Sequence, residues 1–509
     1  MSDTEGRGPA ARSSADTDRR DLARGAGANY LGSVARIAPR ALFLVFAGRF
    51  YGDAGFGSYT FGITVVETAA ALSLFGMKRS LFRFMGEART RGEPVDRAVA
   101  NGIALAAGAG LAATLLVGFF ATPLAGAFGL PGAAAHLRVL TLALPLIVAS
   151  DILLIAIRFT RRMRFEVVAR SLVEPITLTL ALLALRAAGM GDVALSVAYV
   201  VSLLAAAVTT GVFFTHLFPT RAILGTRLSL RELRGLVAFS GPTAGYELFL
   251  MLADKVDVFL VSYFGTSATV GVYGMARQFA TVTKKIRAGF DRILPPVLSE
   301  SIAADDLGRA DQQVTMVARW ILTVQLMVVL LFAFFGAGIM GATGAEFAAG
   351  ALALALLMAA DAVNGSVGVG ELPFVFLRPW VNVWLGALLF VLTGGLGLLW
   401  TPVHGAAGAA GAVLAAAVLA NGARIVASRR LLGLALVRAN ILKPVAAGGL
   451  AAATLILLRA LLPAWLPLGH GLPGALLVLG AYLAWLRLLG LEDEDRDQLS
   501  RITARLRRG

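Results

Sequence analysis

The sequence predicts an all-α, polytopic membrane protein with about fourteen transmembrane helices. Of the 509 residues, 58% are hydrophobic and only 15% are charged, and the mean hydropathy is +0.77. A soluble domain could not bury that much apolar surface, so lipid must contact much of it. The apolar runs are continuous and about 20 residues long, which is the length of a helix that crosses a bilayer. Strands of a membrane barrel would instead show an alternation of apolar and polar residues, which these runs lack.

Fourteen apolar segments have this length, and their ends are predicted to within about two to four residues. In lipid such segments must be helical, because only a helix satisfies its backbone hydrogen bonds within one segment. The predicted spans are residues 29–50, 56–76, 98–120, 138–157, 165–187, 193–215, 236–263, 270–292, 317–336, 347–369, 380–398, 406–426, 441–462 and 472–490.

Basic residues are distributed very unevenly among the connections between these spans. Alternate connections form two sets, and one set holds 36 of the 46 Lys and Arg residues while the other holds none. The rule that basic loops stay inside predicts that the first set is cytoplasmic. Both termini would then be cytoplasmic and the protein would lie in the cell inner membrane, with much of its net charge of +15 near anionic membrane lipids. The basic set comprises 1–28, 77–97, 158–164, 216–235, 284–316, 370–379, 424–443 and 487–509.

Several classes of function find no support in the sequence. Residues 1–28 are polar and lack an apolar core, which predicts a disordered cytoplasmic tail and not a signal peptide. Residues 491–509 form a second cytoplasmic tail. There are no cysteines, the four histidines are scattered, and no phosphate-binding loop is present. We therefore expect no metal, no cofactor, no nucleic-acid partner and no enzymatic activity.

An internal repeat relates the two halves of the chain. The segments Phe50–Tyr59 and Phe264–Tyr273 share a phenylalanine, a glycine and a tyrosine at one offset of 214 residues. Gly191 and Gly405 have the same offset. Spans 1–6 (29–235, the N-lobe) and 7–12 (236–430, the C-lobe) are then parallel repeats, an architecture that transporters use with a site between the halves. Spans 13 and 14 (431–490) are additional.

Short motifs of glycine, proline and aromatic residues lie at the ends of the predicted helices. They are Gly57 with Tyr59, Leu74-Phe-Gly76, Arg79-Ser-Leu-Phe-Arg83, Phe239-Ser-Gly-Pro242, Asp257, Gly271-Val-Tyr273, Pro295-Pro296 and Pro402-Val-His-Gly405-Ala-Ala-Gly408. These motifs resemble the polysaccharide flippase branch of the multidrug/oligosaccharidyl-lipid/polysaccharide exporter superfamily, and the resemblance covers about residues 25–440. It implies export of a lipid-linked oligosaccharide (undecaprenyl-pyrophosphate-linked) across the bacterial inner membrane by alternating access, for surface lipopolysaccharide or exopolysaccharide. A polysaccharide polymerase and glycosyltransferases are the partners that it implies.

Span 1 carries charge at a depth where charge is costly. Asn29, Ser33, Arg36 and Arg40 share one helical face, and Arg40 lies about 18 Å into the helix, too deep for its side chain to reach either interface easily. The offset of 214 maps Ser33 onto Glu247 and Arg40 onto Asp254, with Asp257 one turn further on. Equivalent helices of the two lobes thus carry opposite charge at similar depth, and pairing or solvation of those charges is expected.

These charges define the predicted site. Arg36, Arg40 and Arg277 are the candidate substrate ligands, since guanidinium groups suit a diphosphate or an acidic sugar. A second group of residues is predicted to couple transport to H⁺ or Na⁺ or to form a gate between the lobes. This second group comprises Glu67, Glu247, Asp254 and Asp257. Lys255, which is adjacent to Asp254 in the sequence, could neutralise Asp254 or Asp257 locally.

Three functions remain open at this point, and the flippase ranks first. The second is a cation-coupled exporter of drugs or other small molecules, which would favour an acidic, aromatic cavity without several buried arginines. The third is a membrane polysaccharide polymerase or ligase, an enzyme that would need catalytic groups outside. The longest external connection, 121–137, is apolar and offers only His136.

Overall fold

A computed structural model of the chain describes residues 9–74, 76–160, 162, 164–226, 228–229, 233–235, 242–290, 294–461 and 471–490, with side chains from Pro39 onward except at 78, 79, 224, 242–244, 439 and 472. Within these ranges every regular element is a helix, which confirms the predicted fold class. Eight of the described helical segments are long and apolar enough to cross a membrane. The number of fourteen spans stays a prediction.

The N-lobe begins with one long helix that contains two of the predicted spans. In α1 (Pro9–Ser73) the backbone leaves the helical conformation at Gly52, where φ is 64° and ψ is −172°, between spans 1 and 2. The next helices are α2 (Met77–Thr90), α3 (Asp96–Ala127), α4 (Ala133–Leu140), α5 (Ala143–Phe159), α6 (Arg164–Glu166), a π-helical turn η1 (Val167–Val173), α7 (Glu174–Ala187), α8 (Ala194–Leu217) and α9 (Thr220–Gly225).

The second half of the chain repeats this pattern of long and broken helices. In α17 (Pro379–Leu432) Gly405 has a φ of 55° between spans 11 and 12, a conformation that favours glycine. The other elements are α11 (Pro242–Phe264), α12 (Ser267–Ala288), α13 (Leu294–Ala303), α14 (Leu307–Gly341), η2 (Ala345–Gly350), α15 (Ala351–Ser366), η3 (Val367–Gly370), α16 (Glu371–Leu377), η4 (Ala439–Ile441), α18 (Leu442–Leu461) and α19 (Gly471–Leu488).

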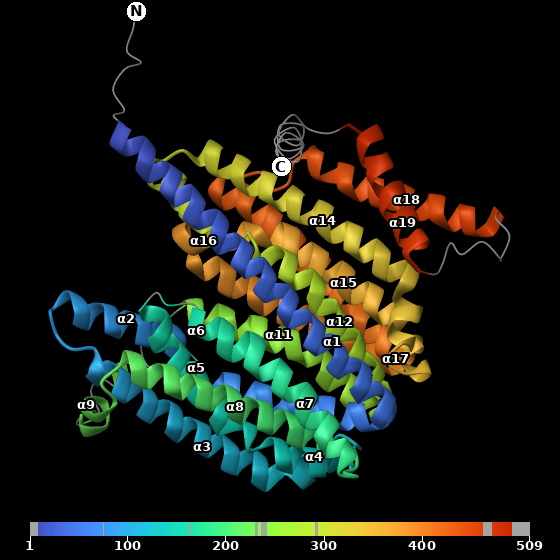
Figure 1. The fold of residues 1–509 in the computed structure, drawn as a ribbon. Coiled ribbons are helices and arrows are strands. Elements are labelled where there is room, and N and C mark those ends of the chain that lie inside the picture. The colour runs from blue at the N-terminus through green and yellow to red at the C-terminus, as the bar shows by residue number, and fades with distance from the viewer. Residues whose placement is uncertain are drawn as a thin grey trace, which may run out of the picture.

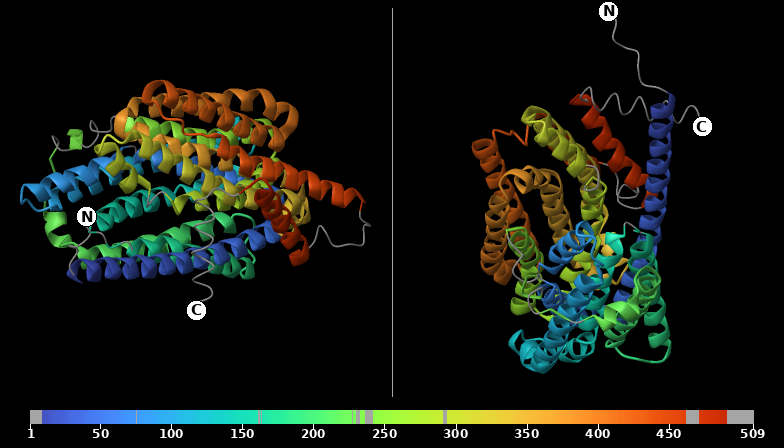
Figure 2. Two further views of the ribbon diagram at one scale, coloured as in Figure 1. Left: turned by 90° about the horizontal axis from the view of Figure 1, so that it is seen from above. Right: turned by 90° about the vertical axis from the view of Figure 1, so that its left-hand side faces the viewer.

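The helices gather into two groups that meet along α1, α11 and α12. Figure 1 shows α3, α5, α7 and α8 on one side and α14, α15 and α17 on the other. Helix α1 packs against both α11 and α12, and so joins the two groups. The views in Figures 1 and 2 place α18 and α19 next to α14, against which both helices pack.

The two repeats touch through a pair of glycines. A Cβ atom on Gly57 would lie 1.7 Å from the carbonyl oxygen of Ser267, and one on Gly271 would lie 1.9 Å from that of Asp53. Asp53 and Ser267 are themselves 214 residues apart. Such a reciprocal contact is what a two-fold axis between the repeats produces. The helix backbones therefore approach closely at this end of the bundle, opposite the end where the Lys- and Arg-rich connections lie (the basic end).

The tail before span 1 differs from its prediction. Residues 1–28 were expected to be disordered, yet α1 already begins at Pro9. Extending an existing helix costs far less than starting one, and the alanines and arginines of this segment favour helix. Residues 1–8 and the predicted tail 491–509 lie outside the described residues.

Candidate functional site: a charged cavity between the lobes

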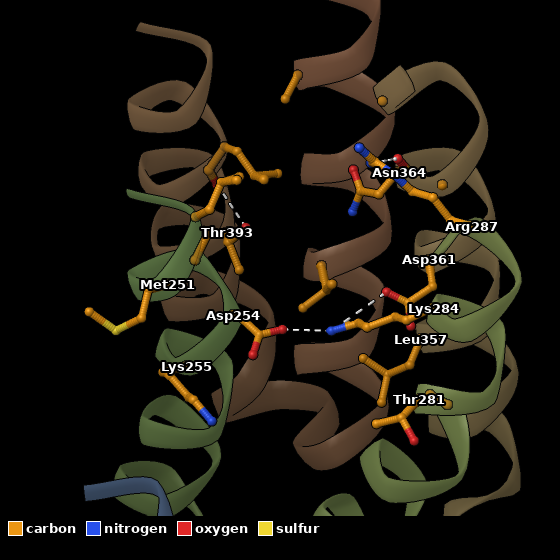
Figure 3. Close-up of a pocket in the computed structure, with 18 of the residues that line it drawn as sticks. Met251, Asp254, Lys255, Thr281, Lys284, Arg287, Leu357, Asp361, Asn364 and Thr393 are labelled. Atoms are coloured by element: carbon orange, nitrogen blue, oxygen red, sulfur yellow. Dashed lines mark hydrogen bonds and ion pairs between the residues drawn. The ribbon is translucent and has the colours of Figure 1, made fainter. Parts of the chain in front are cut away.

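A cavity of about 620 Å³ lies where the two groups of helices meet. Its walls come from α1, α11, α12, α15, η3, α16 and α17, mostly from the parts nearest the basic end. The glycine contact lies toward the opposite end. Figure 3 shows Asp254, Lys284 and Asp361 directed toward one another across this space. The charged residues that line it are Arg40, Glu67, Asp254, Lys255, Arg277, Lys284, Arg287, Asp361, Glu371 and Arg424.

An ion-pair network joins α11 to α12. Asp254 accepts from Lys284 Nζ at 2.7 Å and lies 3.1 Å from Arg277 Nη2, while Arg277 also pairs with Asp257. Tyr273 donates to Asp257 Oδ2 at 2.5 Å. Asp254 and Asp257 are one turn apart on α11, and Arg277 and Lys284 are two turns apart on α12, so each pair faces the other helix. Asp257 is 1% exposed, and its charge is balanced by this network.

Arg40 enters the cavity from the N-lobe without an acidic partner. Its Nη2 donates to Gln278 Oε1 at 2.9 Å, and no carboxylate of the described residues lies within ion-pair distance. Asp254, its equivalent under the repeat, is held by Arg277 and Lys284 instead. The two residues thus line one cavity but do not pair with each other, because α12 supplies closer cations to Asp254.

Glu67 forms the ion pair that crosses between the lobes in this cavity. Lys255 Nζ lies 2.7 Å from Glu67 Oε2, and Tyr199 donates to the other carboxylate oxygen at 3.4 Å. The sequence left open that Lys255 neutralises Asp254 or Asp257, whereas its ion pair is with Glu67. One residue along a helix turns the side chain by about 100°, which points Lys255 toward α1 and away from the α12 network.

Two predicted site residues cannot be placed in the cavity. Glu247 lies on α11 and is exposed, and it is not among the residues that line the cavity. The side chain of Arg36 lies outside the described residues. Asp257 is close to the cavity but sits behind Arg277.

Sequence reasoning missed a second polar group at the basic end of the cavity. Arg287 and Arg424 were counted among the basic connections 284–316 and 424–443, yet α12 and α17 continue as helices and turn both side chains inward. Helical spacing was the available signal, since Arg277, Lys284 and Arg287 lie on one face of α12. The group comprises Tyr246, Arg287, Asn364, Glu371, Asn421 and Arg424.

Comparison with known proteins identifies this architecture. The sequence profile of a family described as polysaccharide biosynthesis protein matches residues 45–342. No curated protein matches the chain by sequence.

Solved structures share the fold at low sequence identity. Lipid II flippase MurJ in an inward closed conformation is 13% identical with a TM-score of 0.69, over 90% of this chain and 98% of that one. An inward-facing multidrug resistance MATE family transporter of the MOP superfamily is 15% identical with a TM-score of 0.60, over 78% and 99%. A MATE transporter from Vibrio cholerae is 16% identical with a TM-score of 0.55, over 81% and 95%. The chain therefore has the fold of polytopic membrane transporters.

Proposed function

Because the chain belongs to the polysaccharide biosynthesis protein family, we propose that it flips a lipid-linked oligosaccharide across the bacterial inner membrane for surface polysaccharide biosynthesis. The observation that carries this proposal is the cavity between the lobes, where Arg40 has no acidic partner among the described residues. Arg40 is exposed to the cavity and its one side-chain hydrogen bond there is to Gln278, so its permanent charge is available to an anion. The diphosphate of an undecaprenyl-pyrophosphate carrier would supply that anion, in a planar geometry that the guanidinium fork suits.

The proposed transport cycle is alternating access. The basic end of the bundle is the cytoplasmic end, so the cavity takes its substrate from the cytoplasmic side while the Gly57 and Gly271 backbones close the external side. Separating these glycines would open the cavity outward. Glu67 and Lys255 link the lobes across the cavity and would part in the same step.

Deletion of the gene tests the substrate class. The strain should lose surface polysaccharide and accumulate the lipid-linked oligosaccharide on the inner leaflet, and Arg40→Ala should behave like the deletion at matched membrane abundance. Arg91→Ala is the control, because Arg91 is an exposed arginine paired with Glu87 on α2, outside the cavity. Normal polymer in a deletion strain without a paralogue would refute the proposal.

A cation-coupled exporter of small molecules is the alternative. The carboxylates of the cavity and the fold shared with multidrug transporters favour it. Drug sensitivity in the deletion strain with unchanged polysaccharide would select this function.

Membrane orientation is tested separately. Reporter fusions after residues 54, 130, 190, 267, 342, 402 and 467 should read as periplasmic, because the connections there contain no Lys or Arg. Both termini should read as cytoplasmic. A cytoplasmic signal at two consecutive internal sites would contradict the fourteen-span topology.

A further inference from the structure

The polar group at the basic end of the cavity is distinct from the α11–α12 network. Arg287 Nη2 lies 2.6 Å from Glu371 Oε1, and Arg287 Nη1 donates to the backbone oxygen of Asn364 at 3.0 Å. Asn421 donates to Asn364 Oδ1 at 2.8 Å. In Figure 3 Arg287 and Asn364 lie together, above Lys284 and Asp361. Five helices thus contribute a cluster rich in amide and guanidinium groups.

Arg424 is the member of this cluster whose bonding is incomplete. It is 6% exposed and lines the cavity. Its Nη1 donates to Asn421, its Nη2 lies 3.5 Å from the Tyr246 hydroxyl, and its Nε has no hydrogen-bond partner. Among the described residues no carboxylate lies within ion-pair distance of it. A buried cation with an unused donor is costly, so an anion that reaches Nε would be bound strongly.

Gly368 lets two guanidinium groups pack close to the backbone of η3. A Cβ atom on this residue would lie 3.0 Å from Arg287 Nη1 and 3.7 Å from Arg424 Nη1. The two like charges therefore converge beside a position without a side chain. Glu371 pairs with Arg287 and accepts from the Tyr246 hydroxyl, and no ion pair joins it to Arg424, so the single charge of Arg424 is left unbalanced among the described residues. That charge matches a carboxylate better than a phosphate monoester, which carries about −1.5 to −2.

This cluster lies too far from Arg277 to share one diphosphate with it. Arg277 and Arg287 are ten residues apart on α12, which corresponds to about 15 Å along the helix. Tyr246 and Asp254 are about 12 Å apart on α11 by the same rise per residue. Neighbouring phosphates joined through one oxygen cannot span that distance. A ligand that satisfies both groups must carry two separate anionic centres.

We propose that Arg424, with Arg287 beside Gly368, forms a second anion subsite that binds the carboxylate of an acidic sugar. This inference rests on the proposed flippase function and narrows the substrate to an oligosaccharide that contains a uronic acid or a sugar of like charge. In this arrangement Arg40 binds the diphosphate of the carrier lipid, and Arg424 binds the charged sugar of the glycan. The amides of Asn364 and Asn421 and the Tyr246 hydroxyl are placed to bond the hydroxyl groups of the same sugar.

Equilibrium binding to the full chain in lipid nanodiscs tests the subsite. The probes are trigalacturonate, its uncharged methyl ester and inorganic pyrophosphate. Wild type should bind the acid about tenfold more tightly than the ester, as expected for a charge-assisted bidentate contact. Arg424→Gln should reduce this preference to about twofold or less and leave pyrophosphate affinity unchanged. Arg40→Gln should weaken pyrophosphate binding and leave the preference for the acid over the ester unchanged.

A second variant tests the subsite independently, in case Arg424→Gln fails to fold. Gly368→Ala removes no polar group but places a methyl group 3.0 Å from Arg287 Nη1, so it shifts that guanidinium and should also remove the preference for the acid. Gly338→Ala is its control, since no atom lies within 4 Å of a Cβ there. Equal binding of acid and ester by wild type, or a preference that survives both Arg424→Gln and Gly368→Ala, would overturn the proposal.

Failure of the subsite and failure of the flippase proposal give different results. If only the subsite is wrong, the deletion strain still accumulates lipid-linked oligosaccharide while the acid preference is absent. If the flippase proposal is wrong, no lipid-linked intermediate accumulates, whatever the binding preference.

Discussion

The two lobes place different chemistry on equivalent helices. In the N-lobe Phe43 and Tyr59 make an edge-on ring contact with centroids 6.3 Å apart, and Ile63 lies buried one turn beyond Tyr59. These three residues form part of an apolar core.

At an offset of 214 residues the same three positions in the C-lobe are polar. They are Asp257, Tyr273 and Arg277, and here the tyrosine donates to the aspartate while the arginine pairs with it. The repeat therefore preserves the close approach of equivalent positions but not their chemistry. The C-lobe also supplies five of the six cations that line the cavity. The charged lining of the cavity is concentrated in one lobe, while the other supplies Arg40 and Glu67.

The largest effect on export is expected at Gly57 and Gly271, the equivalent glycines where the two lobes are most alike. Gly57→Ala and Gly271→Ala each drive a methyl group into a backbone carbonyl, at 1.7 Å and 1.9 Å, and a backbone atom cannot move aside as a side chain can. Both variants should lose the closed external end and nearly all export. Gly108→Ala is the control, because a Cβ there has no neighbour within 4 Å.

Cysteine labelling gives the measurement for these glycine variants. The natural chain contains no cysteine, so a single cysteine at Ser58 reports alone on access from outside. Ser58 is 5% exposed and should react only when the helices separate. Equal labelling of wild type and both glycine variants would show that the contact does not close this end.

The next largest effect is expected on stability, when the polar triad of Asp257, Tyr273 and Arg277 is broken. Arg277→Ile leaves Asp257 buried without its cation and should cost about 3–5 kcal/mol of stability. The double change Asp257→Phe with Arg277→Ile recreates the residues of the N-lobe and should recover most of that loss, seen as a recovered melting temperature. Export should stay low in the double variant if Arg277 also binds substrate. Full recovery of export would reduce the triad to a structural element.

The comparison between lobes also marks what the sequence could predict. Span length and the absence of Lys and Arg from alternate connections are local properties, so the helices were visible from composition. The offset of 214 predicted that Gly57 and Gly271 are equivalent, because close backbone approach restricts both positions to glycine. Partners were harder to predict, since they depend on how each helix is rotated. Lys255 was assigned to its own helix but faces Glu67 of the other lobe.

Arg424 illustrates a second limit on what the sequence alone can predict. An arginine near a helix end contributes to topology whether or not its side chain turns inward, so its position alone carries no signal about binding. Only the continuation of α17 to Leu432 places it inside the helix, and only the packing of α11 and α15 encloses it. Burial of a charged group depends on elements far apart in the chain.

Arg40 and Asp254 provide the third test. Because Asp254 is held by Arg277 and Lys284, Arg40→Ala should change stability by less than about 0.5 kcal/mol while export falls at least tenfold. Arg40→Lys keeps the charge but loses the fork and should export at an intermediate rate. Adding Asp254→Ala should not restore export to Arg40→Ala. Recovery in that double variant would mean that the two residues act as a pair between the lobes and that Arg40 does not hold substrate.

The smallest effect on stability is expected at Glu67 and Lys255, the ion pair that crosses from lobe to lobe. Both side chains are partly exposed, at 39% and 21%, so loss of the pair by Glu67→Gln should cost less than about 1 kcal/mol. Export should fall severalfold, because the closed arrangement of the lobes loses a contact.

The charge swap Glu67→Lys with Lys255→Glu restores an attractive pair and should restore at least half of the export if the pair is a gate. Glu87→Gln on α2 is the matched control, since it breaks exposed ion pairs within one helix. If the swap exports no better than Glu67→Gln, the carboxylate itself is required at position 67, and Glu67 carries the coupling H⁺ or Na⁺ and is not a gate.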